Sequence, residues 1–455
     1  MSRRLDRWVR RPAGIPALST YDTAAGVELL GFAAAAAVVG VLTGLAAATF
    51  RAALSWLADR RTDLSDWTGH HWWVAPLVVL GCAAATAVSA WLVRGVEPHA
   101  EGSGIPRVEA VVEGRTEPGR FRILPVKYVG GLLSIGAGLA LGREGPSVQM
   151  GGNIAVIVAK LTRRHGDQLR LLVAGGAAAG LATAFNAPIA GGVFVLEELV
   201  RRFDPKATIA TLIASAAGFA GAHLLLPSET EFHVAHLHDP RLSQAGWVAL
   251  LGILCGLAGV AYNRSIMRAL RYVDGSRWSA EARGAVIGAL VGVLVLVAPT
   301  LVGGGDNLTE DALLGTGTFA AVVGILALRW VLGVVSYAAC TPGGLFAPML
   351  VLGSHLGLAV GLIAHAIDPG APEPAGLALI GMAALFTASV HAPVTGIVLA
   401  TEMTGTTTLL SPTLGACAIA MTIAVALRAG GIYDLLTTRA VLASRANESD
   451  ALDRG

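Results

Sequence analysis

The sequence predicts an all-α integral membrane protein made of two repeats of tilted and broken helices. Three observations predict this fold class. First, 54% of the 455 residues are hydrophobic and only 14% are charged, whereas a soluble chain carries roughly a quarter charged residues. Second, long apolar runs follow one another almost to the end of the chain. Third, the two halves share a pattern of Pro, Gly and Glu residues.

The apolar runs are predicted to be membrane-spanning helices. Only helices or closed barrels satisfy their backbone polar groups in lipid, and these runs are too long and too continuous for barrel strands. Several approach the ~20 residues that span a bilayer, whereas others are shorter or interrupted by Gly and Pro. The clearest runs lie at 26–50, 72–94, 123–141, 171–199, 208–226, 246–262, 284–302, 318–340, 344–366, 375–400 and 412–427.

Lysine and arginine predict the orientation of a multi-pass protein in the cell membrane. Arginines precede the first run and flank the last, and the loop 227–245 holds one arginine but three acids. The positive-inside rule therefore puts both termini in the cytoplasm and this loop outside. Arg51, Arg60 and Arg61 fit less simply, because one crossing separates them from the N-terminus; a tilted or interfacial first helix would resolve the conflict. The predicted parts are a cytoplasmic N-terminal segment (1–25), a first transmembrane repeat (26–235), a second transmembrane repeat (236–440) and a short cytoplasmic tail (441–455).

The two halves also match in register. Segments 176–188 and 381–393 both combine small residues with a final Ala-Pro. Corresponding broken segments in two halves of a membrane protein point to a transporter whose site lies between the repeats. At one common offset the matching pairs are Pro188 and Pro393, Gly191 and Gly396, and Glu197 and Glu402.

Four stretches place a Gly-rich or tight turn and a Pro directly before an apolar helix. Pro is favoured at the first helical position, and glycine lets the preceding backbone turn tightly. We expect each stretch to begin a helix inside the membrane, where unpaired N–H donors and a partial positive charge bind an anion. The alternative is that these are ordinary Pro kinks in packed spans. The stretches lie at 102–106, 142–146 and 343–348, with the pair 186–188 and 391–393 as the fourth.

Ser103 and Glu144 stand at two of these helix starts. Ser103 can donate its O–H to a dehydrated halide, which partial dipole charges release faster than a full Lys or Arg charge would. A carboxylate such as Glu144 is expensive between apolar segments and is usually functional there. It would compete with a free anion for one site, and protonation would remove the competition. The alternative role for Glu144 is an ion pair with its neighbour Arg143.

The remaining charges in apolar surroundings are interpreted more conservatively. Glu197 and Glu198 end an apolar run just before Arg201. We expect at least one of them to pair with an arginine. A second carboxylate far from Glu144 would give protons a separate binding site on the inner side of the protein, here called the inner proton station. The four cysteines lie singly in apolar runs, so the sequence indicates no metal site and no cofactor. Structural pairing is the expectation for Lys127, Arg329 and Glu402.

Together these motifs resemble the CLC family of chloride channels and chloride–proton exchangers. The resemblance runs in the family's order from about Gly26 to Tyr433. It implies a homodimer with one ion pathway per subunit, each subunit having two inverted-topology repeats with the ion site at their interface. The motifs are GSGIP (102–106), GREGP followed by SVQ (142–149), AFNAPIAGGVFVLEE (184–198), GLFAP (344–348), HAPVTGIVLATEMT (391–404) and Tyr433 after the final span.

The resemblance also implies the roles of individual residues. Glu144 is implied to be the external gating glutamate, and Glu198 the internal proton-transfer glutamate typical of exchangers, at a position where channels usually lack an acid. The implied anion-binding groups are the side chains of Ser103 and Tyr433, the backbone N–H groups of Leu345 and Phe346, and nearby backbone donors from Arg143 and Gly145.

These residues predict a secondary active chloride–proton antiporter rather than an enzyme. Its expected partners are chloride, protons, the lipid bilayer and a second copy of the chain, and the small net charge of +2 argues against nucleic acid. A passive voltage- or pH-gated chloride channel of the same fold is the nearest alternative. A fluoride exchanger, a cation–proton antiporter and an intramembrane serine hydrolase using Ser103 and His391 are weaker ones, the last because a nucleophile-elbow motif is missing.

Overall fold

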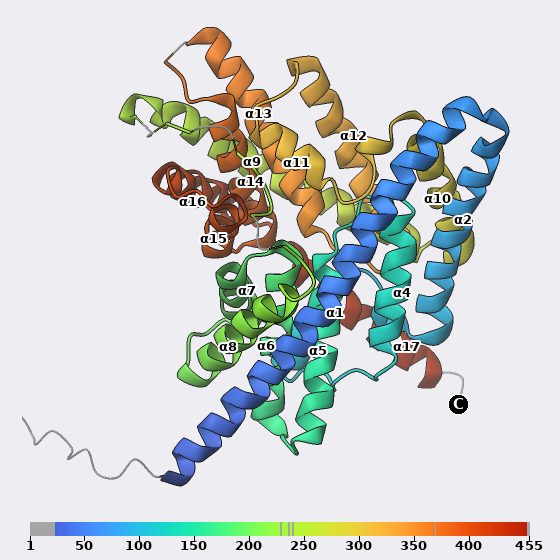
Figure 1. Ribbon diagram of the computed structural model, residues 1–455, viewed down its shortest axis with the longest axis vertical. Helices are drawn as coiled ribbons and strands as arrows, with labels where there is room; N and C mark the ends of the chain where they lie inside the picture. The colour runs from blue at the N-terminus through green and yellow to red at the C-terminus, as the bar shows by residue number, and fades with distance from the viewer. Residues whose placement is uncertain (1–22, 228–229, 235–236, 239–240, 369, 453–455) are drawn as a thin grey trace, which may run out of the picture.

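A computed structural model describes residues 23–227, 230–234, 237–238, 241–368 and 370–452. Every regular element among them is helical, which confirms the predicted fold class, and seven of these helices are long and apolar enough to cross a membrane. The expected N-terminal segment 1–25 lies almost entirely outside the described residues. Figure 1 shows the helices crossing one another at many angles rather than forming a parallel bundle.

The first half contains α1 (Thr23–His70), α2 (Ala75–Trp91), α3 (Ile105–Val112), α4 (Ile123–Gly136), α5 (Glu144–Leu161), α6 (Gly166–Phe185), α7 (Pro188–Phe194) and α8 (Pro205–Ala222). The second half contains α9 (Ala245–Asp274), α10 (Ala280–Val297), α11 (Asp306–Leu313), α12 (Phe319–Tyr337), α13 (Phe346–Ile367), α14 (Pro374–Val390), α15 (Pro393–Thr404) and α16 (Leu410–Ala426), followed by α17 (Ile432–Leu452). Short helical segments are η1 (Trp72–Val74), η2 (Leu92–Val96), η3 (Pro98–Ala100), η4 (Val195–Leu199), η5 (Leu242–Gln244) and η6 (Pro299–Leu301).

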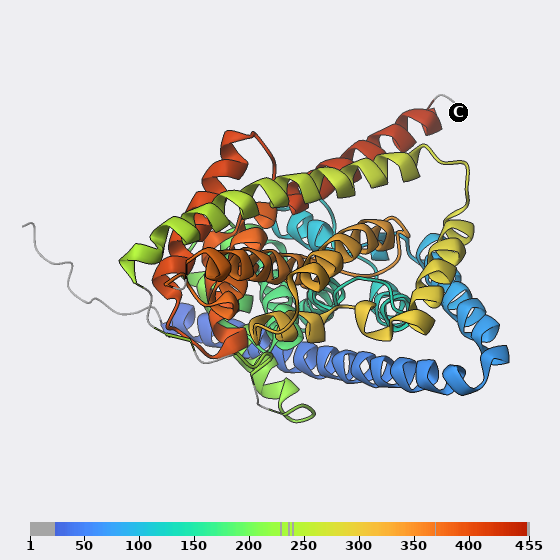
Figure 2. The ribbon, with the colours of Figure 1, turned by 90° about the horizontal axis from the view of Figure 1, so that it is seen from above.

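The two halves pack in the same way. Helix α1 contacts α6 and α8, and α9 contacts α14 and α16 in the same arrangement. Helices α5 and α6 form a central pair, as α13 and α14 do. Figure 2 shows α1, in blue, and α9, in yellow-green, along opposite edges of the molecule. The internal repeat is therefore present in three dimensions, as two repeats of inverted topology.

Close helix contact at glycine pairs is repeated in both halves. A Cβ added to Gly151 of α5 would lie 2.0 Å from the carbonyl oxygen of Gly176 in α6. The matching glycines of α13 and α14 are Gly353 and Gly381. A Cβ added to either one would lie 2.5 Å from the carbonyl oxygen of the other, so these two backbones are also in direct contact. Glycine costs about 1 kcal/mol relative to Ala inside a helix, but here it lets two backbones touch.

Helix α1 explains the arginines that fitted the orientation rule poorly. Its 48 residues extend roughly 72 Å at 1.5 Å per residue, more than twice the ~30 Å hydrocarbon core. Such a helix must tilt strongly or leave the bilayer. The arginines also have partners inside the protein: Arg51 pairs with Glu231, Arg60 with Asp63, and Arg61 donates to the carbonyl of Gly136.

Candidate functional site

Three predicted helix starts meet in one hydrogen-bonded junction. Gly142, before α5, and Gly344, before α13, exchange two backbone hydrogen bonds of 2.9 and 2.7 Å. The N–H of Gly343 donates to the carbonyl of Gly102, before α3, at 3.0 Å. The starts of α3, α5 and α13 therefore point into one place, although they come from both repeats.

The starts of α7 and α15 have a different role. The N–H groups of Ile189 and Ala190 at the start of α7 donate to Glu402, at 2.9 and 2.6 Å. Those of Val394 and Thr395 at the start of α15 donate to Glu197, at 3.0 and 2.7 Å. Each repeat thus supplies the glutamate that caps the other's helix, and Figure 1 shows α7 and α15 as neighbours. In this structure a glutamate from the opposite repeat accepts from these N–H groups, which agrees with the structural pairing expected for Glu402.

Glu144 reaches from the start of α5 to the start of α13. Its side chain is fully buried, and Oε1 accepts from the N–H of Phe346 at 2.7 Å and from that of Ala347 at 3.4 Å. First-turn N–H groups have no partner inside their own helix, and the helix dipole adds partial positive charge. A carboxyl group that belongs to the protein therefore occupies the N-terminus of α13.

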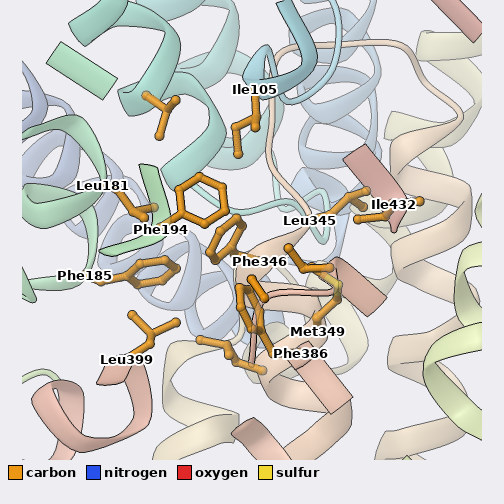
Figure 3. Close-up of a cluster of buried hydrophobic side chains, with 14 of the residues drawn as sticks. Ile105, Leu181, Phe185, Phe194, Leu345, Phe346, Met349, Phe386, Leu399 and Ile432 are labelled. Atoms are coloured by element: carbon orange, nitrogen blue, oxygen red, sulfur yellow. The ribbon is translucent and has the colours of Figure 1, made fainter. Parts of the chain in front are cut away.

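Phe346 is the donor to Glu144 that was also named in the sequence analysis. The family resemblance assigns the N–H groups of Leu345 and Phe346 to a central chloride, and that role stays a prediction; in the structure Phe346 donates to Glu144 and Leu345 precedes the first turn of α13. Phe346 is held in place by aromatic packing, with ring centroids 4.7 Å from Phe386, 5.1 Å from Phe194 and 5.6 Å from Phe185. Figure 3 shows its ring in the middle of this cluster. The packing fixes the direction in which the two N–H groups point.

Two glycines leave the room that the Glu144 carboxylate fills. A Cβ added to Gly142 would lie 2.0 Å from Oε2 and 2.2 Å from Oε1 of Glu144, and one on Gly344 would lie 2.3 Å from Oε1. Side chains cannot occupy these positions while the carboxylate is in place. The glycines of the GREGP and GLFAP motifs are therefore required by this close approach.

Ser103 and Tyr433 bring two hydroxyls to the same place. Ser103 lies against α5, because a Cβ on Gly145 would lie 2.6 Å from its Oγ. Tyr433 stands in the first turn of α17, with its ring 5.9 Å from that of Phe346, and it interacts electrostatically with Glu144. Both residues are buried, and neither hydroxyl has a hydrogen-bond partner within the described part of the chain. Buried hydroxyls are seldom left unpaired, so two together indicate a binding position for an acceptor.

Arg143 does not pair with Glu144. Its guanidinium forms ion pairs with Glu231 and with Asp306, the latter at 3.1 Å, and its Nε donates to the carbonyl of Ala184. The ion-pair alternative for Glu144 is therefore not what the structure shows. Glu231 and Asp306 were not singled out from the sequence, because neither lies in a recognisable motif.

Glu198 lies in a second ionisable cluster, separate from Glu144. It is buried in η4, and its Oε1 is 3.7 Å from the Nη2 atom of Arg201. The same nitrogen contacts Asp434 at 2.6 Å and Glu109 at 3.3 Å. Glu109 is a buried acid that the sequence analysis missed. Tyr433 lies within electrostatic range of both Glu198 and Glu144.

The other buried cations bind backbone carbonyls rather than carboxylates. Lys127 donates to the carbonyls of Ala100 and Gly102, at 3.0 and 2.6 Å, and so holds the loop that carries Ser103. The guanidinium of Arg329 donates to three carbonyls between α10 and α11, those of Leu301, Gly303 and Gly304. Both side chains support loops at the broken helices.

The fold defines a multi-pass membrane protein in which broken helices from two repeats meet around the buried carboxyl group of Glu144. The sequence model of the family described as "Voltage gated chloride channel" matches residues 85–425. The chain belongs to this family, the CLC proteins.

Solved structures agree with the assignment. The chain is similar to a slow cyanobacterial Cl⁻/H⁺ antiporter, with 32% identity, a TM-score of 0.86, and coverage of 90% of this chain and 98% of that one. It also shares its fold with a eukaryotic CLC transporter (22% identity, TM-score 0.74, covering 90% of this chain and 74% of that one). A CLC-type fluoride/proton antiporter has the same fold as well (21% identity, TM-score 0.74, covering 89% and 97%).

Proposed function

We propose that the protein is a secondary active antiporter that exchanges chloride for protons. One observation carries the proposal: the carboxylate of Glu144 accepts from the N–H groups of Phe346 and Ala347, beside the unpaired hydroxyls of Ser103 and Tyr433. This is an anion-binding position occupied by an ionisable side chain. Similarity to a Cl⁻/H⁺ antiporter over most of the chain supports the same conclusion.

Coupling follows from competition between two anions for these donors. Ionised Glu144 holds the N–H groups through charge-assisted hydrogen bonds, which are roughly twice as strong as neutral ones. Protonation removes the negative charge, so the side chain loses its advantage over chloride at the start of α13. Chloride then takes the two N–H groups, and the hydroxyls of Ser103 and Tyr433 rotate to donate to it. When chloride leaves and Glu144 releases its proton, the carboxylate returns.

Protons need a second route, because chloride occupies the space beyond Glu144. Glu198 is buried near Arg201 and lies within electrostatic reach of Tyr433. We assign it the role of inner proton station, from which protons reach Glu144 past Tyr433. Arg143 and Gly145 contribute backbone donors near the external end of the path, and Leu345 contributes at the central position. The homodimer and the cytoplasmic location of both termini belong to the same proposal.

The Glu198→Gln variant is expected to lose proton transport and keep chloride transport. Its side chain cannot carry a proton, so chloride-driven proton flux should fall by roughly 100-fold, in the range found for losing one proton-transfer group. Both fluxes are measured together in liposomes, with a chloride electrode and a pH electrode. The matched control is Glu97→Gln, another buried glutamate, which pairs with His99 instead. Undiminished proton flux in Glu198→Gln would exclude this residue as the station.

A passive chloride channel of the same fold remains the second candidate. In a pH gradient the reversal potential of an antiporter shifts with the proton gradient, whereas that of a channel follows chloride alone. The acid at Glu198 favours the antiporter. The serine hydrolase finds no support in the geometry, because the Ser103 hydroxyl makes no hydrogen bond to His391 within the described residues.

A further inference from the structure

A strap of three residues, Glu231, Phe232 and His233, lies against the protein beside the start of α5. The carboxylate of Glu231 pairs with the guanidinium of Arg51 in α1, at 2.6 Å, and with that of Arg143, the residue directly before Glu144. Its side chain is only 6% exposed, and those of the two arginines are 22% and 14% exposed. Two guanidinium groups from distant parts of the chain thus converge on a single carboxylate.

The strap is anchored independently of Glu231. Phe232 is buried, and its N–H donates to the carbonyl of Met403 at the end of α15, at 2.9 Å. His233 contacts Glu310 of α11 through its backbone N–H, at 3.3 Å, and through its ring Nδ1, at 2.7 Å. Two anchors next to Glu231 already hold the segment in place, so its carboxylate is not needed to attach the loop.

The charges around Glu231 balance one another. Arg51 and Arg143 are close enough to repel each other, and Glu231 and Asp306 supply the two compensating negative charges. Guanidinium groups are weakly hydrated and present several donors in a fixed plane, which suits them to hold an anion that has lost part of its water. The guanidinium of Arg143 also interacts electrostatically with Glu144, so an anion held between the two arginines would lie near the position of the Glu144 carboxyl group.

We propose that Arg51 and Arg143 form an outer halide site, in which Glu231 is a tethered competitor for the incoming anion. Chloride enters by displacing the Glu231 carboxylate from Arg51, and the carboxylate returns when the chloride moves inward. Glu231 then sets the chloride concentration that half-saturates transport, without taking part in proton transfer. The inference rests on the proposed function only in that anions pass this way.

Three variants test this by changing the charge of the cluster in steps. Glu231→Gln removes the competitor and leaves one net positive charge, so the half-saturating chloride concentration should fall by about threefold or more. Arg51→Gln leaves one net negative charge and should raise it by a similar factor. The double variant restores the balance and should return close to the wild-type value.

The measurement is tracer chloride exchange in liposomes, at equal chloride on both sides and constant ionic strength kept with an impermeant anion. Chloride–chloride exchange needs no proton coupling, so the result is informative even if the proposed antiport is wrong. The control is Glu373→Gln, a carboxylate that pairs with His238 further along the same loop and contacts neither arginine. It should leave the half-saturating concentration unchanged.

A purely structural role for the Arg51–Glu231 pair predicts a different pattern. Both single variants would then lower thermal stability and turnover, and neither would reduce the half-saturating chloride concentration. The outer site would be overturned if the half-saturating chloride concentration of Glu231→Gln were unchanged or raised. It would also be overturned if that of the double variant lay further from the wild-type value than that of either single variant.

Discussion

The Glu144→Gln protein is expected to carry chloride while carrying no protons. The side-chain oxygen of a glutamine at this position can still accept from the N–H groups of Phe346 and Ala347, but the side chain bears no negative charge and exchanges no proton. Chloride therefore displaces it easily, and the link between the two fluxes is lost. In liposomes, chloride efflux should persist, and the chloride gradient should no longer drive proton movement above the leak of empty vesicles. Simultaneous chloride and pH recordings measure both.

Glu402→Gln is the matched control for this variant. Glu402 is also a glutamate at a helix start, but it caps α7 with two hydrogen bonds and has no contact with the junction at Glu144. Its variant should keep proton coupling even if the protein is less stable. Chloride-driven proton transport that survives in Glu144→Gln would contradict the competition mechanism.

The Gly142→Ala variant should lose most of both fluxes. The added methyl group would lie 2.0 Å from Glu144 Oε2, in the volume that either the carboxylate or a chloride ion must occupy. Overpacking of this kind costs about 1–3 kcal/mol, which corresponds to roughly fivefold to 150-fold weaker occupancy by either anion. Flux measurements at increasing chloride concentrations should show a reduced maximal rate and a higher half-saturating chloride concentration.

Gly324→Ala provides the comparison, since a Cβ on this glycine of α12 meets nothing within 4 Å. It should transport like the wild type. Both purified variants should also be checked for the wild-type melting temperature, so that misfolding is not mistaken for a blocked site. A folded Gly142→Ala protein with wild-type fluxes would show that the carboxylate position is not on the anion path.

Local features of the sequence predict much of this structure. Pro stands at the first or second residue of α3, α7 and α15, as its missing N–H favours, and at the third residue of α5 and α13, which therefore begin two residues earlier than the prolines indicate. The repeat also follows from local residues, since Gly151 and Gly353 occupy equivalent contacts. Glu144 stands out because a carboxylate is expensive between apolar segments.

What the sequence could not predict depends on contacts between distant segments. Glu197 and Glu402 cap helices about 200 residues away in the chain, so no local pattern shows that they fill two of the expected anion positions. The same applies to Glu231, which acts through Arg51 and Arg143. Tyr433 follows the last span as expected, but the further helix α17, in whose first turn it stands, was not predicted from the sequence.

The central claim is that the N–H groups at the start of α13 bind a halide that Glu144 otherwise replaces. Crystals of Glu144→Gln grown in bromide test it directly through anomalous scattering. A bromide peak is expected within hydrogen-bond distance of the N–H groups of Phe346 and Ala347, facing the Ser103 and Tyr433 hydroxyls. Well-diffracting crystals with bromide only at the protein surface, and none at this junction, would contradict the account.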